Sequence, residues 1–271
     1  MESAVLGSLP GLFKDMTEEN KELNISVAEE MAQKEVGDVD VNLLKEMAEK
    51  GVMYGHKKTR THPKFKQFIF TTRNGMEIID LAKTVKAIEN AADFINKIIS
   101  EKKTILLVGT QPSSWQAVKK MSDQLGFPMI KNHWIGGLIT NYKIISQRLE
   151  FFRNGMKDME KGEFEKYTKK ERVMISKKLA KLKIMFEGLD NFNKIPDAIF
   201  VVDTTVRDHV TAFKEAKIAK IPVIAIIDSD DNPEPVDYSI PANDHSKMSI
   251  EWIVDRILSL VKAAPQLPNE A

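Results

Sequence analysis

Cations and aromatic rings alternate in the segment GHKKTRTHPKFKQFIF, which spans residues 55–70. From Lys50 to Arg73 there are seven lysines and arginines and no carboxylate, so nothing nearby in the sequence compensates the positive charge. Such cations neutralise phosphates, and neighbouring rings stack on unpaired bases. We predict that this segment binds RNA rather than forming a solvated basic loop, with Phe68 and Phe70 facing the core. The predicted RNA-binding residues are His56, Lys57, Lys58, Arg60, Lys64, Lys66 and Arg73.

A second segment, KNHWIGGLITNYK, places two glycines and a tryptophan just before a strongly charged stretch. Gly136 and Gly137 permit backbone dihedrals or close approaches that side chains would block. We expect Trp134 to anchor this corner in the core. The polar side chains that flank the corner are then predicted to contact an RNA backbone, and they are His133, Asn141 and Lys143.

Two carboxylates suggest a different chemistry. Asp203 and Asp228 each follow a predicted strand, and carboxylates at the carboxyl edge of a parallel sheet could hold Mg²⁺. The simpler interpretation, which we favour, is that each aspartate caps the turn or helix that follows. The five histidines show no metal-binding spacing, so we predict no cofactor beyond a structural Mg²⁺.

Sequence motifs for catalysis are missing. The strand TILLVG is followed by Thr110-Gln111-Pro112-Ser113-Ser114, which lacks the glycines of a phosphate-binding loop. Neither H-E-x-x-H nor G-x-S-x-G occurs in the sequence. We therefore predict that the chain is not an enzyme and has no small-molecule substrate. An α/β enzyme that uses Asp203 and Asp228 is the alternative.

Short apolar runs alternate with amphipathic helices over most of the chain, which predicts an α/β fold with a mostly parallel sheet flanked by helices in a Rossmann/flavodoxin-like three-layer sandwich. Asn74-Gly75 between QFIF and MEII predicts a β-hairpin. The segment 228–244 contains three prolines, and we expect a loop there. The predicted strands are TILLVGT, PMI, AIFVVD and PVIAIID, and the predicted helices cover residues 41–50, 80–101, 113–125, 206–219 and 245–264.

Residues 141–190 interrupt this alternation with an inserted antiparallel coiled-coil helical hairpin. Between its two arms, Thr168 and Glu171 match a capping box. The residues of one predicted apolar seam are Ile145, Leu149, Phe152, Met156 and Met159, and those of the other are Ile175, Leu179, Leu182, Phe186 and Leu189. We divide the chain into an acidic, partly disordered extension (1–40), an α/β domain (41–264) and a short tail (265–271).

Composition restricts the compartment and the partners. The chain has no cysteine and no apolar run of the roughly 20 residues that a membrane span needs, so we predict a cytoplasmic protein without a membrane partner. Its net charge of +1 hides a separation of charge, because residues 1–40 hold ten carboxylates against three lysines. RNA would repel such an extension, so we expect it to contact a protein.

Several motifs occur in a fixed order: GVMYGHKKTRTHPKFKQFIFTTRNGMEIIDLAKT, LLVGT, NHWIGGLITNY, TKKE, PDAIFVVD and IPAND. Together they resemble the bacterial ribosomal protein S2 family over residues 41–264. The resemblance implies an α/β sandwich with a coiled-coil hairpin and a structural, non-enzymatic role in translation, as a constituent of the small ribosomal subunit.

The resemblance also implies partners: small-subunit rRNA, other small-subunit ribosomal proteins and the mRNA-binding protein S1. The family's basic stretch matches Gly55, His56 and residues 57–60 of this chain. The family's glycine corner matches Asn132, His133, Gly136, Gly137, Thr140 and Asn141.

Overall fold

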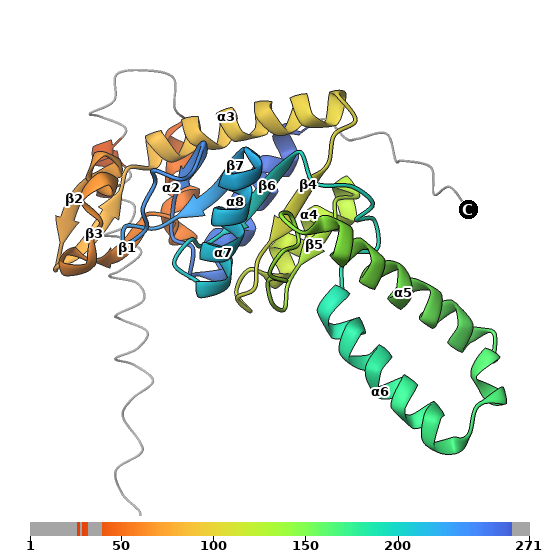
Figure 1. Ribbon diagram of the computed structural model, residues 1–271. Helices are drawn as coiled ribbons and strands as arrows, with labels where there is room; N and C mark the ends of the chain where they lie inside the picture. The colour runs from red at the N-terminus through yellow and green to blue at the C-terminus, as the bar shows by residue number, and fades with distance from the viewer. Residues whose placement is uncertain (1–25, 28, 32–39, 262–271) are drawn as a thin grey trace, which may run out of the picture.

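The computed structural model describes residues 26–27, 29–31 and 40–261 of the chain (Figure 1). The predicted tail 265–271 and most of the acidic extension lie outside these residues. In chain order the elements are α2 (Val41–Glu49), β1 (Tyr54–Lys57), η1 (Lys58–Arg60), η2 (Pro63–Phe68), β2 (Ile69–Arg73), β3 (Met76–Ile79), α3 (Leu81–Ser100), β4 (Ile105–Val108), α4 (Trp115–Leu125), β5 (Met129–Ile130), α5 (Tyr142–Glu160), η3 (Glu163–Lys166), α6 (Lys169–Phe186), β6 (Ala198–Val202), α7 (Arg207–Ala219), β7 (Val223–Ile227), β8 (Tyr238–Pro241) and α8 (Lys247–Leu260).

The main sheet has five strands in the order β5-β4-β6-β7-β8, and every pair is parallel. Numbered along the chain, this order is 2-1-3-4-5, the flavodoxin-like arrangement. The predicted α/β class and mostly parallel sheet are therefore confirmed. The predicted loop at 228–244 was wrong in part, because it contains β8. Pro241 fits at this position because β8 is an edge strand, where one row of backbone groups needs no strand partner.

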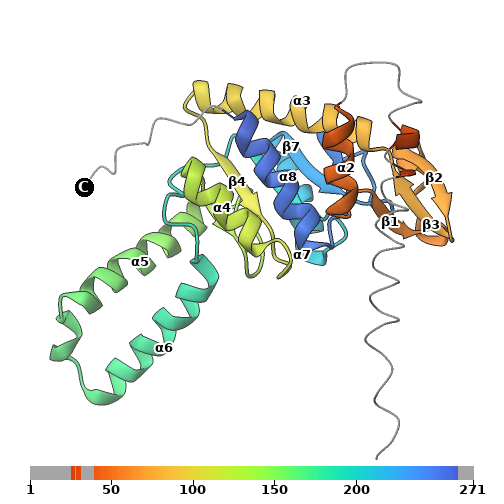
Figure 2. The same cartoon turned by 180° about the vertical axis from the view of Figure 1, so that it is seen from behind.

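Helices cover both faces of the sheet. Alternate residues of β4 show the two layers. Leu107 belongs to the core cluster that includes residues of α2, α3, α4 and α8, whereas Leu106 belongs to the cluster that includes residues of α7 and the root of the α5–α6 hairpin. Figure 2 shows α2, α4 and α8 together on one side. The central strands β4, β6 and β7 are buried on both faces, which explains why they have continuous apolar sequences.

A small antiparallel sheet, ordered β1-β3-β2, lies beside the β7–β8 side of the main sheet (Figure 1). The predicted hairpin is present, and its turn residues Asn74 and Gly75 have φ values of +49° and +75°. These are the positive dihedrals that favour Asn-Gly in tight hairpins. Phe65, in η2, is fully buried and fixes the basic segment to the core, while Phe68 and Phe70 are partly buried against the two core clusters.

The α5–α6 hairpin protrudes from the α/β body, as predicted (Figure 1). Both halves of the Thr168–Glu171 capping box are formed at the start of α6. Near the body, Leu149 and Phe186 are buried in the seam. Met159 is 43% exposed, so its predicted place in the seam was wrong. It lies in the last turn of α5, beyond the part of the hairpin that the α/β body covers.

Part of the acidic extension packs on the body. Val27 and Met31 are buried in the core cluster that contains α2 and α3. Glu29 pairs with Lys45 at 2.8 Å, and Glu30 pairs with Arg73 at 2.8 Å. In the described part of the extension, two carboxylates thus pair with this chain's own cations.

Candidate nucleic-acid interface

The basic segment runs from the end of β1 to η2 and is held in place by its backbone. The Lys58 N–H donates to Gly75 O at 3.0 Å, and the His62 N–H donates to Ser229 O at 2.8 Å. The second bond joins the segment to the loop after β7. Because both ends of η1 are fixed, its exposed side chains are presented on an ordered backbone, which lowers the entropic cost of binding.

The predicted cations of this segment fall into two groups. Lys57, Lys58, Arg60 and Lys66 are exposed, and none of them forms an ion pair within the described residues. Lys64 pairs with Glu234. Arg73 Nη2 donates to both carboxylate oxygens of Glu30, at 2.9 Å to Oε1 and 2.8 Å to Oε2. The sequence shows no carboxylate near these cations, but the fold supplies two.

The corner after β5 is organised by Glu215, a buried carboxylate on α7. It accepts hydrogen bonds from Trp134 Nε1 (3.0 Å) and from the backbone N–H of Gly137 (2.8 Å). It also accepts from the N–H of Ile139 (3.0 Å) and from the N–H and Oγ1 of Thr140 (both 3.2 Å). One side chain therefore accepts hydrogen bonds from several donors of an otherwise irregular turn.

The protonation of Glu215 follows from these contacts. Burial by itself would raise the pKa of Glu215, but the hydrogen bonds from Trp134, Gly137, Thr140 and Ile139 outweigh it. The pKa is held below the usual 4.5, so the side chain is ionised at neutral pH.

Glu215 is not among the functional residues predicted from the sequence. A signal was present, because Glu215 lies beside Ala216 on the face of α7 that also buries Ala212 and Phe213. A carboxylate on a core-facing helix position requires buried donors elsewhere in the chain.

For the corner after β5, the predictions for Trp134 and Gly137 are confirmed, whereas the prediction for Gly136 is not. Trp134 is 2% exposed and anchors the corner in the core, as expected. Gly137 has a φ of +83°, which explains the glycine there, but Gly136 has neither a positive φ nor a close neighbour. His133, Asn141 and Lys143 are exposed at the root of α5, and His133 Nδ1 lies 2.5 Å from Asp208 Oδ2.

The two strand-end aspartates lie in one acidic cluster. Asp203, Asp228, Asp231 and Asp244 are each at most 2% exposed. Asp203 Oδ1 accepts from the backbone and hydroxyl of Thr205, both at 2.7 Å, and Asp228 Oδ1 accepts from the Ser229 N–H. These are the turn-capping contacts of the simpler interpretation. Burial raises the pKa of Asp231 to about 7, and burial together with the neighbouring aspartates raises that of Asp244.

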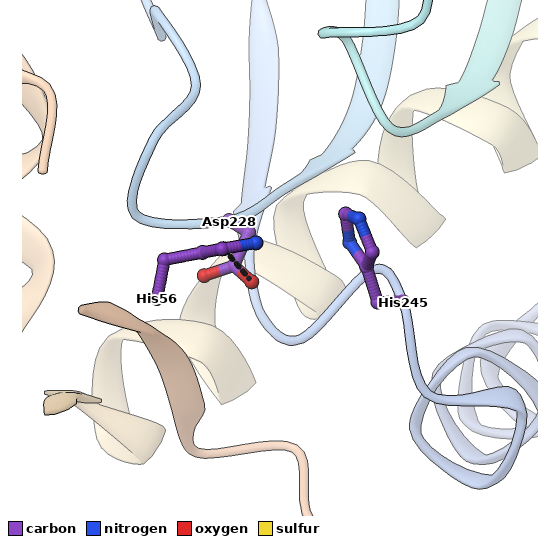
Figure 3. A group of neighbouring side chains, drawn as sticks. All are labelled: His56, Asp228 and His245. Atoms are coloured by element: carbon purple, nitrogen blue, oxygen red, sulfur yellow. Dashed lines mark ion pairs between the residues drawn. The ribbon is translucent and has the colours of Figure 1, made fainter. Parts of the chain in front are cut away.

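The same cluster contains two histidines far apart in the sequence (Figure 3). His56 Nδ1 lies 3.0 Å from Asp228 Oδ2, and contact with this carboxylate raises the pKa of His56. His245 lies across from them, with its ring centroid 5.0 Å from that of His56. The sequence offered no carboxylate near His56, so only the fold brings these groups together.

The crevice at the carboxyl ends of β4 and β6 is where open sheets of this topology bind ligands. Here Gln111 Nε2 donates to Asp203, and Thr110 Oγ1 lies 3.0 Å from His209 Nε2. Burial lowers the pKa of His209, so its ring is neutral and its Nδ1–H donates to Asp203 O. Side chains of the protein itself therefore pair with the polar groups of this crevice.

The predicted RNA-binding residues form two groups rather than one patch. The basic segment is joined to the loop after β7, whereas His133, Asn141 and Lys143 follow β5 at the opposite side of the sheet. Because parallel strands end at the same edge, both groups lie toward the carboxyl edge of the sheet.

The sequence profile described as Ribosomal protein S2 matches residues 47–264. This chain belongs to the ribosomal protein S2 family. It is 38% identical over 218 residues to the small ribosomal subunit protein uS2 of Petrotoga mobilis, which covers 80% of this chain and 75% of the relative. The uS2 proteins of Thermus thermophilus (38%, covering 84% of that protein) and Dehalococcoides mccartyi (35%, 88%) match over the same 80% of this chain.

Membership in the S2 family gives the chain a structural role in the ribosome, and the family is non-enzymatic. The alternative of an enzyme built on Asp203 and Asp228 is thereby set aside. Among the described helices, none combines the length and apolar character that a membrane span needs.

Proposed function

We propose that this protein is a structural constituent of the small ribosomal subunit that binds small-subunit rRNA through two groups of side chains and contacts neighbouring ribosomal proteins through its hairpin and body. The observation that carries the proposal is the set of exposed cations on an ordered backbone. Lys57 is the last residue of β1, and Lys58 and Arg60 belong to η1, which is fixed at both ends. A rigid row of unpaired cations suits a folded polyanion.

The corner supplies the second proposed contact. His133, Asn141 and Lys143 lie at the root of α5, where Glu215 fixes the preceding turn. Lys143 is exposed and adds a cation to this group. Together with the basic segment, this gives two anchoring points on either side of the sheet's carboxyl edge, which would set the orientation of the body on RNA.

The α5–α6 hairpin supports a protein contact in addition to RNA. Between Lys143 and Glu187 there are 13 lysines and arginines against 7 carboxylates, which favours a polyanion. The same arms leave large apolar side chains in solvent, which favours a protein neighbour. These exposed apolar residues are Ile144, Phe151, Met159, Val173, Met174, Ile184 and Met185.

The experiment that tests RNA anchoring is a charge reversal of Lys57, Lys58 and Arg60 to glutamate. Tagged full-length protein is expressed in cells, and lysates are sedimented through sucrose gradients at low and raised salt. We expect the wild type to travel with the small subunit and the variant to shift toward free protein, most strongly at raised salt.

A matched control reverses three exposed lysines elsewhere, Lys97, Lys102 and Lys119, and so changes the net charge equally. This control should sediment like the wild type. If both triple variants lost association with the small subunit equally, total charge and not the basic segment would determine that association. A wild-type chain that stays with free protein at every salt concentration would contradict the ribosomal role itself.

Docking of the mRNA-binding protein S1 is part of the same proposal. Small subunits from cells depleted of this chain should carry less S1, while other small-subunit proteins that assemble independently keep their occupancy. Quantitative mass spectrometry of isolated subunits measures both. Unchanged S1 occupancy would remove S1 from the list of partners.

A further inference from the structure

We infer that the acidic extension is an intrachain competitor for the basic segment. Residues 26–31 anchor the extension beside the segment, and the carboxylates that precede this anchor pair with the segment's cations until rRNA displaces them. The basic segment is the RNA contact of the proposed function, on which this regulation rests.

The anchor is a piece of the extension that is helical at residues 26–27 and 29–31. Val27 and Met31 are four positions apart, on one face of a helix, and each is 1% exposed in the core cluster that contains α2 and α3. Glu30, between them, pairs with Arg73 at the end of β2. Apolar burial therefore holds the extension on the body, and the ion pair determines which part of the body it meets.

This anchor lies close to the exposed cations. In the small sheet, Met76 of β3 is the partner of Lys57 in β1 on one side and of Arg73 in β2 on the other. Neighbouring strands are about 4.8 Å apart, so the backbones of Lys57 and Arg73 are separated by about 10 Å. The contact between Glu30 and Arg73 thus brings the extension to the edge of the basic segment.

Other carboxylates of the extension can reach that segment. Glu18, Glu19 and Glu22 precede Glu30 by 12, 11 and 8 positions. A chain can span about 3.3 Å per residue, so each of these links is long enough to cross the distance of about 10 Å to the nearest cation. Carboxylates held on so short a link face the cations at an effective concentration of about millimolar.

The charges of the two parts are complementary. The extension carries ten carboxylates against three lysines. The exposed cations of the segment have no ion pair within the described residues, and they are Lys57, Lys58, Arg60 and Lys66. An anionic chain end that is tethered beside such cations presents the same charge to them as a phosphate backbone.

The effect on RNA binding would be selective. Any RNA must displace the extension to reach the segment, so every RNA loses the same factor in affinity. A ligand that contacts the segment alone then binds weakly, whereas rRNA that also contacts the corner after β5 keeps the affinity of that second point. The displaced carboxylates are then free to contact a protein neighbour.

The test is fluorescence anisotropy of a labelled oligouridylate, a short RNA without fold, titrated with the full-length chain. One variant neutralises three carboxylates of the extension, Glu18→Gln, Glu19→Gln and Glu22→Gln. We expect it to bind the oligouridylate at least about 5-fold more tightly than the wild type at low salt. This gain should shrink as salt is raised, because salt screens the competing ion pairs.

A matched control neutralises three exposed carboxylates of α3, α4 and α5 and so changes the net charge equally. Its substitutions are Asp93→Asn, Asp123→Asn and Glu160→Gln. This control should bind the oligouridylate within about 2-fold of the wild type. An equal gain in both triple variants would overturn the inference, because net charge alone would then explain it.

The charge-reversed basic segment separates the two claims. If reversal of Lys57, Lys58 and Arg60 leaves RNA affinity unchanged, the segment does not bind RNA and the proposed function fails. If the reversal abolishes binding but neutralisation of the extension has no effect, only the competition fails. Circular dichroism verifies that every variant is folded.

Carbodiimide crosslinking of the free protein provides a readout that needs no RNA affinity. The reagent joins a carboxylate directly to a lysine amine where the two are in contact. We expect links from Glu18, Glu19 or Glu22 to Lys57 or Lys58, and their loss when small-subunit rRNA is added. Links confined to lysines outside the segment, or links that persist unchanged with rRNA bound, would overturn the inference.

Discussion

The indole nitrogen of Trp134 donates a 3.0 Å hydrogen bond to Glu215 Oε1, and this bond joins residues 81 positions apart in the chain. It links the corner after β5 to α7 on one face of the sheet. The corner in turn begins α5, so the direction of the protruding hairpin depends on a buried carboxylate in a distant helix.

Replacing Glu215 with alanine should lower the free energy of unfolding by about 2–4 kcal/mol, because several N–H donors of the corner lose a charged acceptor. Urea unfolding at neutral pH measures the change. Lys214→Ala, an exposed position on the same helix, should stay within about 0.5 kcal/mol of the wild type. A similar loss in both variants would show that the corner does not depend on Glu215.

The stabilisation from Glu215 should also depend on pH. Its pKa is lowered in the folded protein, so between the folded and unfolded values the unfolded chain binds more protons. The contribution is therefore complete above about 4.5 and is lost as the pH falls through the lowered value. Wild type and Glu215→Gln should differ most at neutral pH and converge as the pH falls below the lowered pKa of Glu215. A difference that grows on acidification would contradict the ionised state.

Arg73 and Lys58 should contribute differently to RNA affinity. Lys58 is exposed with no ion pair in the described structure. Lys58→Gln should therefore make the slope of log K for RNA binding against log salt concentration less steep by about 0.7–0.9. Arg73 already neutralises Glu30, so Arg73→Gln should change the slope little. Filter binding to small-subunit rRNA at several salt concentrations measures both slopes. Equal reductions would mean that RNA displaces Glu30.

Loss of the capping box at the hairpin tip should destabilise the start of α6 and leave the main sheet unaffected. Thr168→Ala removes the side chain that caps the Glu171 N–H and should destabilise the start of α6 by about 1 kcal/mol. Hydrogen exchange of the first amides of α6 should accelerate, while exchange in the main sheet stays unchanged. Lys170→Ala, an exposed neighbour outside the box, is the control. Faster exchange throughout the protein would contradict a local effect.

Most helices and strands were predictable because local patterns carry the information. The Asn74-Gly75 turn, the capping box of α6 and the continuous apolar strands each follow from residues next to one another in the chain. Strand β8 was missed because the three prolines of the segment 228–244 suggest a loop, and only the position of β8 at the sheet edge makes Pro241 acceptable.

The sequence by itself determined the α/β class, the protruding hairpin, the family and the position of the basic segment. Periodicity, turn chemistry and runs of charge are local properties that need no knowledge of distant residues. Only the tertiary structure decided which charges meet: Glu30 with Arg73, Glu215 with the corner, and His56 with Asp228 and His245. Electrostatic interactions depend on distances of a few ångströms, and those distances are set by the packing of elements far apart in the chain.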